Sequence, residues 1–230
     1  MISFQKIGSS EVVVDYLNEA IAKRLTAGAK VLWLLSGGSL TPIQIETAKR
    51  LQSQNVQNLT VSLTDERFGP IGHPDSNWQK LVNAGFSLSG AKFRPVLENK
   101  DFASTTADFA AYLKQEFASC DFKIACIGIG ADGHTLGVMP GSIGIDSQEL
   151  VVGYQAADFQ RITMTLGSLT NLDEAVVYMV GREKWSLIDQ IVDEDIPPNK
   201  QPAQVLKTAK KLTIYNDYRG EPSWLHYSNF

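Results

Sequence analysis

Apolar residues occur in two patterns along the chain, at helical spacing and in short continuous runs. Near the N-terminus, apolar residues recur at helical spacing at Val13, Leu17, Ile21 and Leu25. Ser9 and Ser10 precede this segment as candidate caps, and Gly28 follows it as a stop signal. Similar spacing predicts helices from Pro42 through Leu51, from Phe102 to Phe117 and from about Lys184 to Val192.

The continuous apolar runs predict buried strands that alternate with these helices. These runs are Val31 to Leu35, Leu59 to Leu63, Ile124 to Ile129, Val176 to Val180 and Leu212 to Tyr215. Two further strand-like pieces, Leu150 to Gln155 and Arg161 to Leu166, favour an antiparallel or edge addition. The alternation predicts one α/β domain over residues 1–230, a three-layer, doubly wound, mostly parallel sheet with helices on both faces.

Composition narrows the class of partner. The 230 residues carry a formal net charge of −4, with Lys and Arg scattered, which argues against nucleic acid or an anionic membrane as a partner. The N-terminal residues lack the features of a secretory signal, and no apolar run has the length of a membrane span, so we expect a cytoplasmic protein. Two cysteines are too few for a disulfide framework, and Cys126, inside an apolar run, is expected to be a small buried hydrophobe.

Chemically distinctive residues follow four of the predicted strands. They are Ser36-Gly37-Gly38-Ser39, Thr64-Asp65-Glu66-Arg67, Gly130-Ala131-Asp132-Gly133-His134 and Gly181-Arg182-Glu183-Lys184. Ligands of open α/β sheets bind beyond the carboxyl ends of the strands. The four segments together therefore predict an anion-binding site that contains an acid–base group.

The glycine pair Gly37-Gly38 lets the backbone approach a ligand and leads into a helix N-terminus, which favours phosphate. Ser36 and Ser39 can add hydroxyl donors, although an ordinary strand-to-helix turn is an equally simple interpretation. The sequence matches neither a dinucleotide fingerprint nor a nucleotide P-loop, so no nucleotide cofactor is expected. The planar guanidinium group of Arg67 can donate two hydrogen bonds to a phosphate. The alternative is a surface arginine that pairs with Asp65 or Glu66. Lys184 is a second cation for the anion, or it is only solvated.

His134 carries the acid–base hypothesis, because histidine can take a proton from water and return it. Asp132, two residues earlier on a glycine-containing loop, can orient the imidazole. The alternative is a histidine that satisfies backbone groups in a turn. His73 and His226 lack such a setting, and the well-separated histidines without paired cysteines argue against a metal site.

Several ordered motifs resemble those of the 6-phosphogluconolactonases, within the larger group of sugar-phosphate isomerases and deaminases. They are LSGGSLTP (35–42), TDERFGPIGHPDSN (64–77), IGIGADGHTLGVMPG (127–141) and RITMTLGSLTNLDEAVVYMVGREKW (161–185). The chain departs from the family at two places: residues 136–139 are Leu-Gly-Val-Met where the family has Ala-Ser-Leu-Phe, and Phe68-Gly69 replaces an aromatic residue and Val.

The resemblance implies hydrolysis of 6-phospho-D-glucono-1,5-lactone to 6-phospho-D-gluconate, a step of the oxidative pentose phosphate pathway, without a cofactor. It implies that His134 is the general base and that Asp132 orients it. Arg67 and Lys184 would hold the 6-phosphate with the Gly37-Gly38-Ser39 loop, and Arg161 is a weaker candidate for the same anion. A phosphorylated sugar lactone is the expected partner of a monomer or weak dimer.

Three alternative functions are weaker. Glucosamine-6-phosphate deaminases carry Tyr in place of Arg67 and Asn-Glu-Pro where this chain has Val138-Met139-Pro140, so their second acid–base group is missing. A sugar-phosphate sensor would not need the Asp132–His134 pair and would normally carry a DNA-binding module. A serine esterase would need a Gly-x-Ser-x-Gly elbow, which the sequence lacks.

Overall fold

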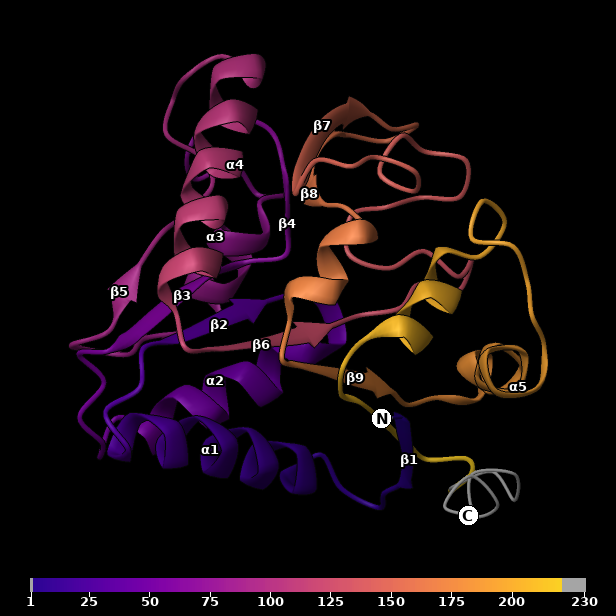
Figure 1. Cartoon of the computed structure of the whole chain (residues 1–230), viewed down its shortest axis with the longest axis horizontal. Coiled ribbons are helices and arrows are strands. Elements are labelled where there is room, and N and C mark those ends of the chain that lie inside the picture. The colour runs from indigo at the N-terminus through magenta and orange to yellow at the C-terminus, as the bar shows by residue number, and fades with distance from the viewer. Residues whose placement is uncertain (1, 221–230) are drawn as a thin grey trace.

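A seven-stranded sheet forms the centre of the computed structural model, which describes residues 2–220 (Figure 1). Its strands lie in the order β1-β10-β9-β6-β2-β3-β5, and all neighbouring pairs are parallel. The strands are β1 (Ile2–Lys6), β2 (Val31–Leu35), β3 (Leu59–Leu63), β5 (Lys92–Phe93), β6 (Phe122–Ile127), β9 (Glu174–Met179) and β10 (Leu212–Asn216). The predicted parallel sheet is therefore confirmed.

The inner strands form where apolar runs can be buried on both faces. Every residue of β2 and β3 is buried, as expected for strands covered by helices on two sides. β6 ends at Ile127, earlier than predicted, because Ile129 instead makes an isolated bridge with Thr135 in the following loop. The edge strands β1 and β5 were not predicted; β5 has only two residues, both exposed, and so leaves no hydrophobic pattern.

The helices connect the strands and cover the sheet. They are α1 (Glu11–Thr26), α2 (Thr41–Leu51), α3 (Asn77–Asn83), α4 (Phe102–Ser119) and α5 (Trp185–Asp193). α1 and α2 lie together on one side of the sheet, and α4 lies on the other (Figure 1). Ser9 accepts a hydrogen bond from the Glu11 N–H (3.2 Å), whereas Ser10 makes no side-chain cap, and Gly28 ends the first helix with a positive φ of 80°.

Short 3-10 turns precede two helices, in segments where ligand-binding residues were expected to lie. The turn η1 (Gly38–Leu40) comes before α2, and η3 (Arg182–Lys184) comes before α5. Lys184 therefore lies in the turn rather than in the first position of the predicted helix. The remaining 3-10 turns are η2 (Gly167–Asn171) and η4 (Pro202–Thr208).

A second, three-stranded antiparallel sheet lies beside the large one. Its order is β4-β8-β7, with β4 (Asp65–Arg67), β8 (Gln160–Met164) and β7 (Val151–Gln155). The two strand-like pieces are thus antiparallel to each other, as one alternative held, but β8 pairs with β4 and neither piece joins the edge of the large sheet. β4 follows β3 after one residue, Thr64, so the small sheet is attached at the carboxyl edge of the large one.

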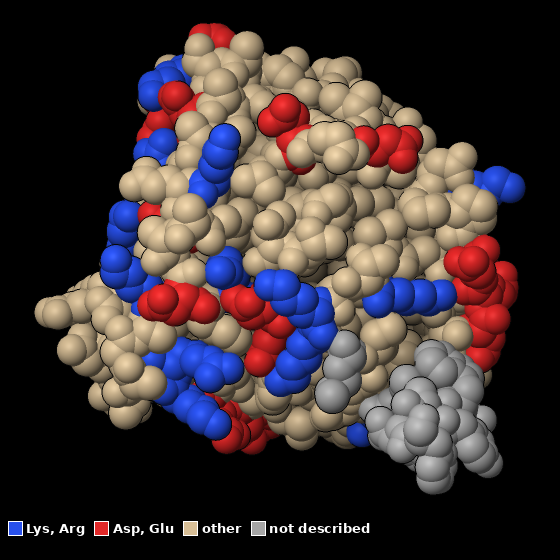
Figure 2. Space-filling model, viewed as in Figure 1, with Lys and Arg blue, Asp and Glu red and all other residues tan. Residues whose placement is uncertain are grey.

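Charged side chains of both signs are interspersed on the face shown in Figure 2, without a broad patch of one sign. No helix among the described residues is both long enough and apolar enough to cross a bilayer. The free Cys120 and Cys126 are buried, and burial raises the pKa of the Cys126 thiol to about 12, which fits the expected role of a small hydrophobe.

The buried stripe of α1 gives a test of the core. Leu17 is fully buried and Val12, on the same helix, is 43% exposed. We expect Leu17→Ala to lower the free energy of unfolding by about 2–5 kcal/mol, because it removes apolar contacts and leaves a cavity. Val12→Ala should change it by less than about 0.5 kcal/mol. Urea denaturation of both variants checks this; equal losses would contradict the assigned helix face.

Candidate functional site

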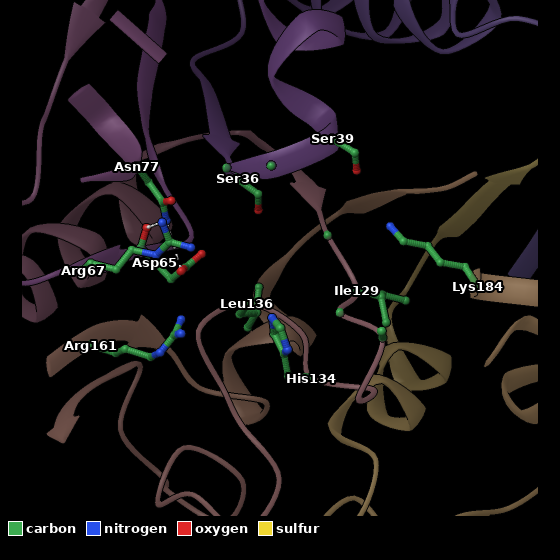
Figure 3. Close-up of a pocket in the computed structure, with 15 residues that line it drawn as sticks. Ser36, Ser39, Asp65, Arg67, Asn77, Ile129, His134, Leu136, Arg161 and Lys184 are labelled. Carbon is green, nitrogen blue, oxygen red and sulfur yellow. Dashed lines mark hydrogen bonds between the residues drawn. The ribbon is translucent and has the colours of Figure 1, made fainter. Parts of the chain in front are cut away.

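A cavity of about 300 Å³ lies where the carboxyl ends of several strands meet (Figure 3). Nine of the ten predicted site residues line it: Ser36, Gly37, Gly38, Ser39, Asp65, Arg67, His134, Arg161 and Lys184. The tenth, Asp132, lies outside the lining but is hydrogen-bonded to His134. The parallel topology therefore brings together residues that are far apart in the sequence.

The glycine loop after β2 is held by hydrogen bonds on the side away from the cavity, and its backbone lines the cavity. The Ser36 hydroxyl donates to the Cys126 carbonyl oxygen (2.7 Å), so this buried side chain serves the loop and is not the free donor that we expected. A Cβ on Gly37 would lie 2.5 Å from Oδ1 of Asn77, so a side chain at this position would have to displace the Asn77 amide. Gly38 has a positive φ of 74° and begins the turn whose first N–H groups have no acceptor within the helix.

The imidazole of His134 is oriented by Asp132. His134 Nδ1 lies 2.6 Å from Asp132 Oδ1, and the His134 backbone N–H donates to the same oxygen (3.2 Å). A Cβ on Gly130 would lie 2.1 Å from Cε1 of His134, so the ring packs directly on this glycine. With Nδ1 engaged, Nε2 is the nitrogen left for a ligand.

Asp132 is suited to remain ionised beside the ring. Partial burial alone would raise its pKa, but the hydrogen bonds from His134 outweigh burial and hold the pKa of this carboxyl below its usual value. A carboxylate so placed fixes the tautomer with the proton on Nδ1 and stabilises the imidazolium once Nε2 has accepted a proton.

Two arginines from the small sheet form one side of the cavity. Arg67 of β4 and Arg161 of β8 are cross-strand neighbours, and both guanidinium groups lie over the Phe159 ring, at 5.6 Å and 6.0 Å from its centroid. Arg67 Nη1 donates to the Asp75 carbonyl oxygen (3.0 Å), and Arg161 Nη2 pairs with Asp158 (2.7 Å). Among the described residues no ion pair joins Arg67 to Asp65 or Glu66, the alternative that the sequence left open.

Lys184 lies across the cavity from these arginines, with His134 between the two sides (Figure 3). Its turn is anchored by Asp217, whose carboxylate accepts hydrogen bonds from the Gly181 N–H (3.2 Å) and from Trp185 Nε1 (3.0 Å). Lys184 is half-buried, and this desolvation lowers the pKa of its ammonium group, with Glu183 opposing the shift.

Sequence reasoning missed the group that ties β4 to α3. The fully buried Glu66 carboxylate accepts from the backbone N–H groups of Arg67 (2.8 Å), Asn77 (2.6 Å) and Trp78 (3.1 Å) and from the Ser76 hydroxyl (2.8 Å). Burial raises the pKa of Glu66, opposed by these hydrogen bonds. The bonds bring Asn77 to the cavity, where its amide donates to the Asp65 carboxylate (3.2 Å).

The departure at residues 136–139 is accommodated by the small sheet. The Gly137 N–H donates to Thr163 Oγ1 (2.9 Å), and the Tyr154 hydroxyl donates to the Gly137 carbonyl oxygen (2.7 Å) while it accepts from the Met139 N–H (3.2 Å). A Cβ on Gly137 would lie 2.9 Å from the Thr163 Cβ, so glycine lets the loop pack closely. Leu136 then adopts a positive φ of 56° and lines the cavity.

At Gly69, the second departure from the family, the ring of a neighbouring histidine fills the space beside the glycine. A Cβ on Gly69 would lie 2.9 Å from Cδ2 of His73, and His73 Nε2 lies 2.9 Å from the Arg67 carbonyl oxygen. The imidazole thus occupies space that a valine side chain would need and supports the backbone of Arg67. His226 lies outside the described residues.

The fold and the site define an open α/β protein whose cavity is lined by two arginines, a lysine and a histidine. Residues 8–215 match the family of glucosamine-6-phosphate isomerases and 6-phosphogluconolactonase. The 6-phosphogluconolactonase of Mesorhizobium japonicum is 30% identical, over 78% of this chain and 77% of its own, and that of Caulobacter vibrioides is 27% identical, over 85% and 90%. The crystal structure of the Thermotoga maritima 6-phosphogluconolactonase superposes with a TM-score of 0.80 at 21% identity, covering 94% of this chain and 98% of that one.

The chain therefore belongs to the glucosamine-6-phosphate isomerase/6-phosphogluconolactonase family. The resemblance found in the motifs is confirmed, and so is the α/β fold of this family.

The Tyr154 hydroxyl gives a test of how the loop that follows His134 is held. We expect Tyr154→Phe to lower the free energy of unfolding by about 1–3 kcal/mol, because the Gly137 carbonyl and the Met139 N–H both lose a partner. Tyr178→Phe is the matched control, since the Tyr178 hydroxyl has no hydrogen-bond partner within the described part of the chain. Urea denaturation curves give the free energy of unfolding of both variants. Equal losses in the two variants would mean that the Tyr154 hydroxyl does not support the loop.

Proposed function

We propose that this protein hydrolyses 6-phospho-D-glucono-1,5-lactone to 6-phospho-D-gluconate. The observation that carries the proposal is the Asp132–His134 pair, set between two cationic sides of one cavity. The family supports a lactone hydrolase, because the relatives named above are 6-phosphogluconolactonases. A phosphorylated lactone has its anionic group at one end and its reactive carbonyl at the other, which suits such a cavity.

In this proposal His134 acts as the general base. Nε2 accepts a proton from a water molecule as the water oxygen attacks C1 of the lactone, and the imidazolium later gives that proton to the ring oxygen that leaves. Asp132 holds the ring through Nδ1 and stabilises its charged form. A lactone is already an activated ester, so a positioned base suffices without a protein nucleophile.

We further propose that the 6-phosphate binds at the glycine loop and Lys184. The N–H groups at the start of η1, the Ser39 hydroxyl and the Lys184 ammonium lie on the same side of the cavity (Figure 3). Helix N-termini and lysine both stabilise phosphate oxygens. The family resemblance implied that Arg67 and Lys184 both hold this phosphate. Because the two residues lie on opposite sides of the cavity and Lys184 is on the side of the glycine loop, we assign the phosphate to Lys184.

The deaminase alternative lacks support in the same geometry. The position where the resemblance expects the deaminase glutamate holds Met139, and the adjacent Val138 is fully buried in the core. No second acid–base side chain is therefore supplied from this loop. Arg67, in place of the deaminase tyrosine, adds a permanent positive charge that suits an ester reaction forming an anion.

The test of the proposal is the rate of 6-phosphogluconate release from lactone made in place by glucose-6-phosphate dehydrogenase, measured above the spontaneous background. We expect the wild-type protein to accelerate hydrolysis and His134→Ala to lose at least about 100-fold of kcat, because the base is removed. The unfolding midpoint should change little, since His134 lies in a partly exposed loop.

The kcat of Asp132→Asn should lie between those of the wild-type protein and His134→Ala, because the orienting hydrogen bond weakens while the base remains. Asp146→Asn, an exposed aspartate beyond the same loop, is the matched control and should behave as wild type. Near-normal turnover of His134→Ala would exclude His134 as the base, and no acceleration by the wild-type protein would exclude the proposed reaction.

The lowered pKa of Lys184 leads us to expect that anion binding depends on pH. Because partial burial lowers the pKa of its ammonium group, Lys184 loses its proton at a lower pH than an ordinary lysine, for which the pKa is about 10.4. The affinity for 6-phosphogluconate, measured by calorimetry, should therefore fall as the pH rises from about 8 to about 10. In Lys184→Gln the affinity should be weaker and nearly independent of pH over this range. A decline of the same size in both proteins would show that another group causes it.

A further inference from the structure

Leu136 combines a rare backbone conformation with a position in the wall of the cavity. Its φ is 56°, and among the described residues other than glycine only Asn99 shares a positive φ. Asparagine tolerates this conformation, whereas it costs energy for leucine, because the Cβ crowds the neighbouring backbone. The Leu136 side chain is only 6% exposed and lines the cavity. A strained residue in such a place indicates that its side chain has a use there.

The turn that contains Leu136 would be less strained with glycine at this position. The Thr135 carbonyl oxygen accepts a hydrogen bond from the Val138 N–H (3.0 Å), so Leu136 and Gly137 are the central residues of the turn. Leu136, and not Gly137, has the positive φ, and turns of this kind favour glycine at the first central position. The glycine stands one position later, where a Cβ would lie 2.9 Å from the Thr163 Cβ. The sequence thus keeps a large side chain at the strained position.

Hydrogen bonds on both sides of Leu136 make it a fixed part of the cavity wall. Before it, the Thr135 hydroxyl donates to the Gly128 carbonyl oxygen (3.1 Å). After it, the Gly137 carbonyl oxygen accepts from the Tyr154 hydroxyl (2.7 Å). The Leu136 side chain itself belongs to the hydrophobic core. A side chain packed in this way cannot move aside for a larger ligand group without displacing its neighbours.

This apolar wall is a departure of the chain from the family pattern. Leu136 stands where the family has alanine, so a larger side chain borders the cavity. Of the described residues that line the cavity, only Leu136 and Ile129 have large apolar side chains. Ile129 lies on the Lys184 side of His134, and Leu136 lies on the side away from Lys184 (Figure 3). The two apolar side chains therefore border different parts of a bound substrate.

The connectivity of the lactone decides which of its groups meets Leu136. C1 is bonded to the ring oxygen, which leads through C5 and C6 to the phosphate, and C1 is bonded on its other side to C2. With C1 at His134 Nε2 and the phosphate at Lys184, C2 lies on the side of C1 away from Lys184. Leu136 is on that side of the cavity (Figure 3). The group attached to C2 is therefore the one that faces the leucine.

We propose that Leu136 is a specificity-determining residue that limits the group on C2 of the sugar to the size of a hydroxyl. This role rests on the proposed lactone hydrolysis and defines its substrate class as phosphorylated sugars without a bulky C2 substituent. A 2-acetamido group would overlap the leucine side chain. Its amide N–H and carbonyl oxygen would also lose water against an apolar surface that offers them no hydrogen bond. Steric overlap and unpaired polar groups are both effective means of rejecting a close relative of a substrate.

The experiment compares two ligands that differ only at C2, glucose 6-phosphate and N-acetylglucosamine 6-phosphate, by calorimetry. Neither is a lactone, so binding is measured without turnover. We expect the wild-type protein to bind the acetamido sugar at least about tenfold more weakly than glucose 6-phosphate. Leu136→Ala, which introduces the family residue, should reduce this difference to about threefold or less.

Two further variants separate the wall from a general loosening of the cavity. Ile129→Ala removes a similar apolar volume on the other side of His134 and should keep the wild-type difference between the two ligands. Leu136→Gly removes the side chain and also the strain of the turn, because glycine adopts a positive φ freely. It should reduce the difference as Leu136→Ala does.

Equal affinity of the wild-type protein for the two ligands, or binding of neither, would overturn the proposal. So would a difference that persists in both Leu136 variants, or one that Ile129→Ala abolishes to the same extent. Failure of the proposed function has another signature. The wild-type protein would then discriminate between the two ligands and yet not accelerate lactone hydrolysis.

Discussion

Antiparallel pairing of β4 with β8 joins Asp65 to Thr163, Glu66 to Ile162 and Arg67 to Arg161, and this ladder holds one whole side of the cavity in place. The alternation of side chains along β4 then has a direct consequence. Asp65 and Arg67 face the cavity, while Glu66 between them points away and binds the start of α3. The same small sheet fixes the loop after His134 through Thr163 and Tyr154. A change in the register of this pairing would therefore displace the arginines and the histidine loop together.

The opposite side of the cavity depends on the large sheet, and the division between the two sheets explains the separation of charge. β2 ends at the glycine loop and β9 ends before the turn that contains Lys184, so both are fixed by the buried parallel strands. A substrate that spans the cavity would meet a cation and backbone N–H groups at one end and a guanidinium pair at the other. Since Lys184 and the arginines are partly or largely buried, their interactions with an anion are screened less by water than those of surface charges.

The sequence was informative where burial produces a pattern. Continuous apolar runs predicted β2 and β3 with their bounds, and the four segments after the strands contain ten of the fifteen residues that line the cavity. β4 could not be predicted, because a three-residue strand of charged residues has no hydrophobic period. Nor could sequence spacing show that the Ser36 hydroxyl is engaged by Cys126, that Glu66 is a buried cap, or that Arg67 and Lys184 lie on opposite sides. These features depend on contacts between segments far apart in the chain, although the Asp-Ser-Asn run ending at Asn77 was a signal that this residue belongs to the site.

The central claim is that the cavity binds the two ends of one substrate on opposite sides, and a crystal structure with bound 6-phosphogluconate tests it most directly. The account predicts the phosphate at the Gly38–Ser39 backbone and Lys184, with the carboxylate within hydrogen-bond distance of Arg67 or Arg161 and C1 next to His134 Nε2. A phosphate bound by the arginine pair, with the carboxylate toward Lys184, would contradict the account.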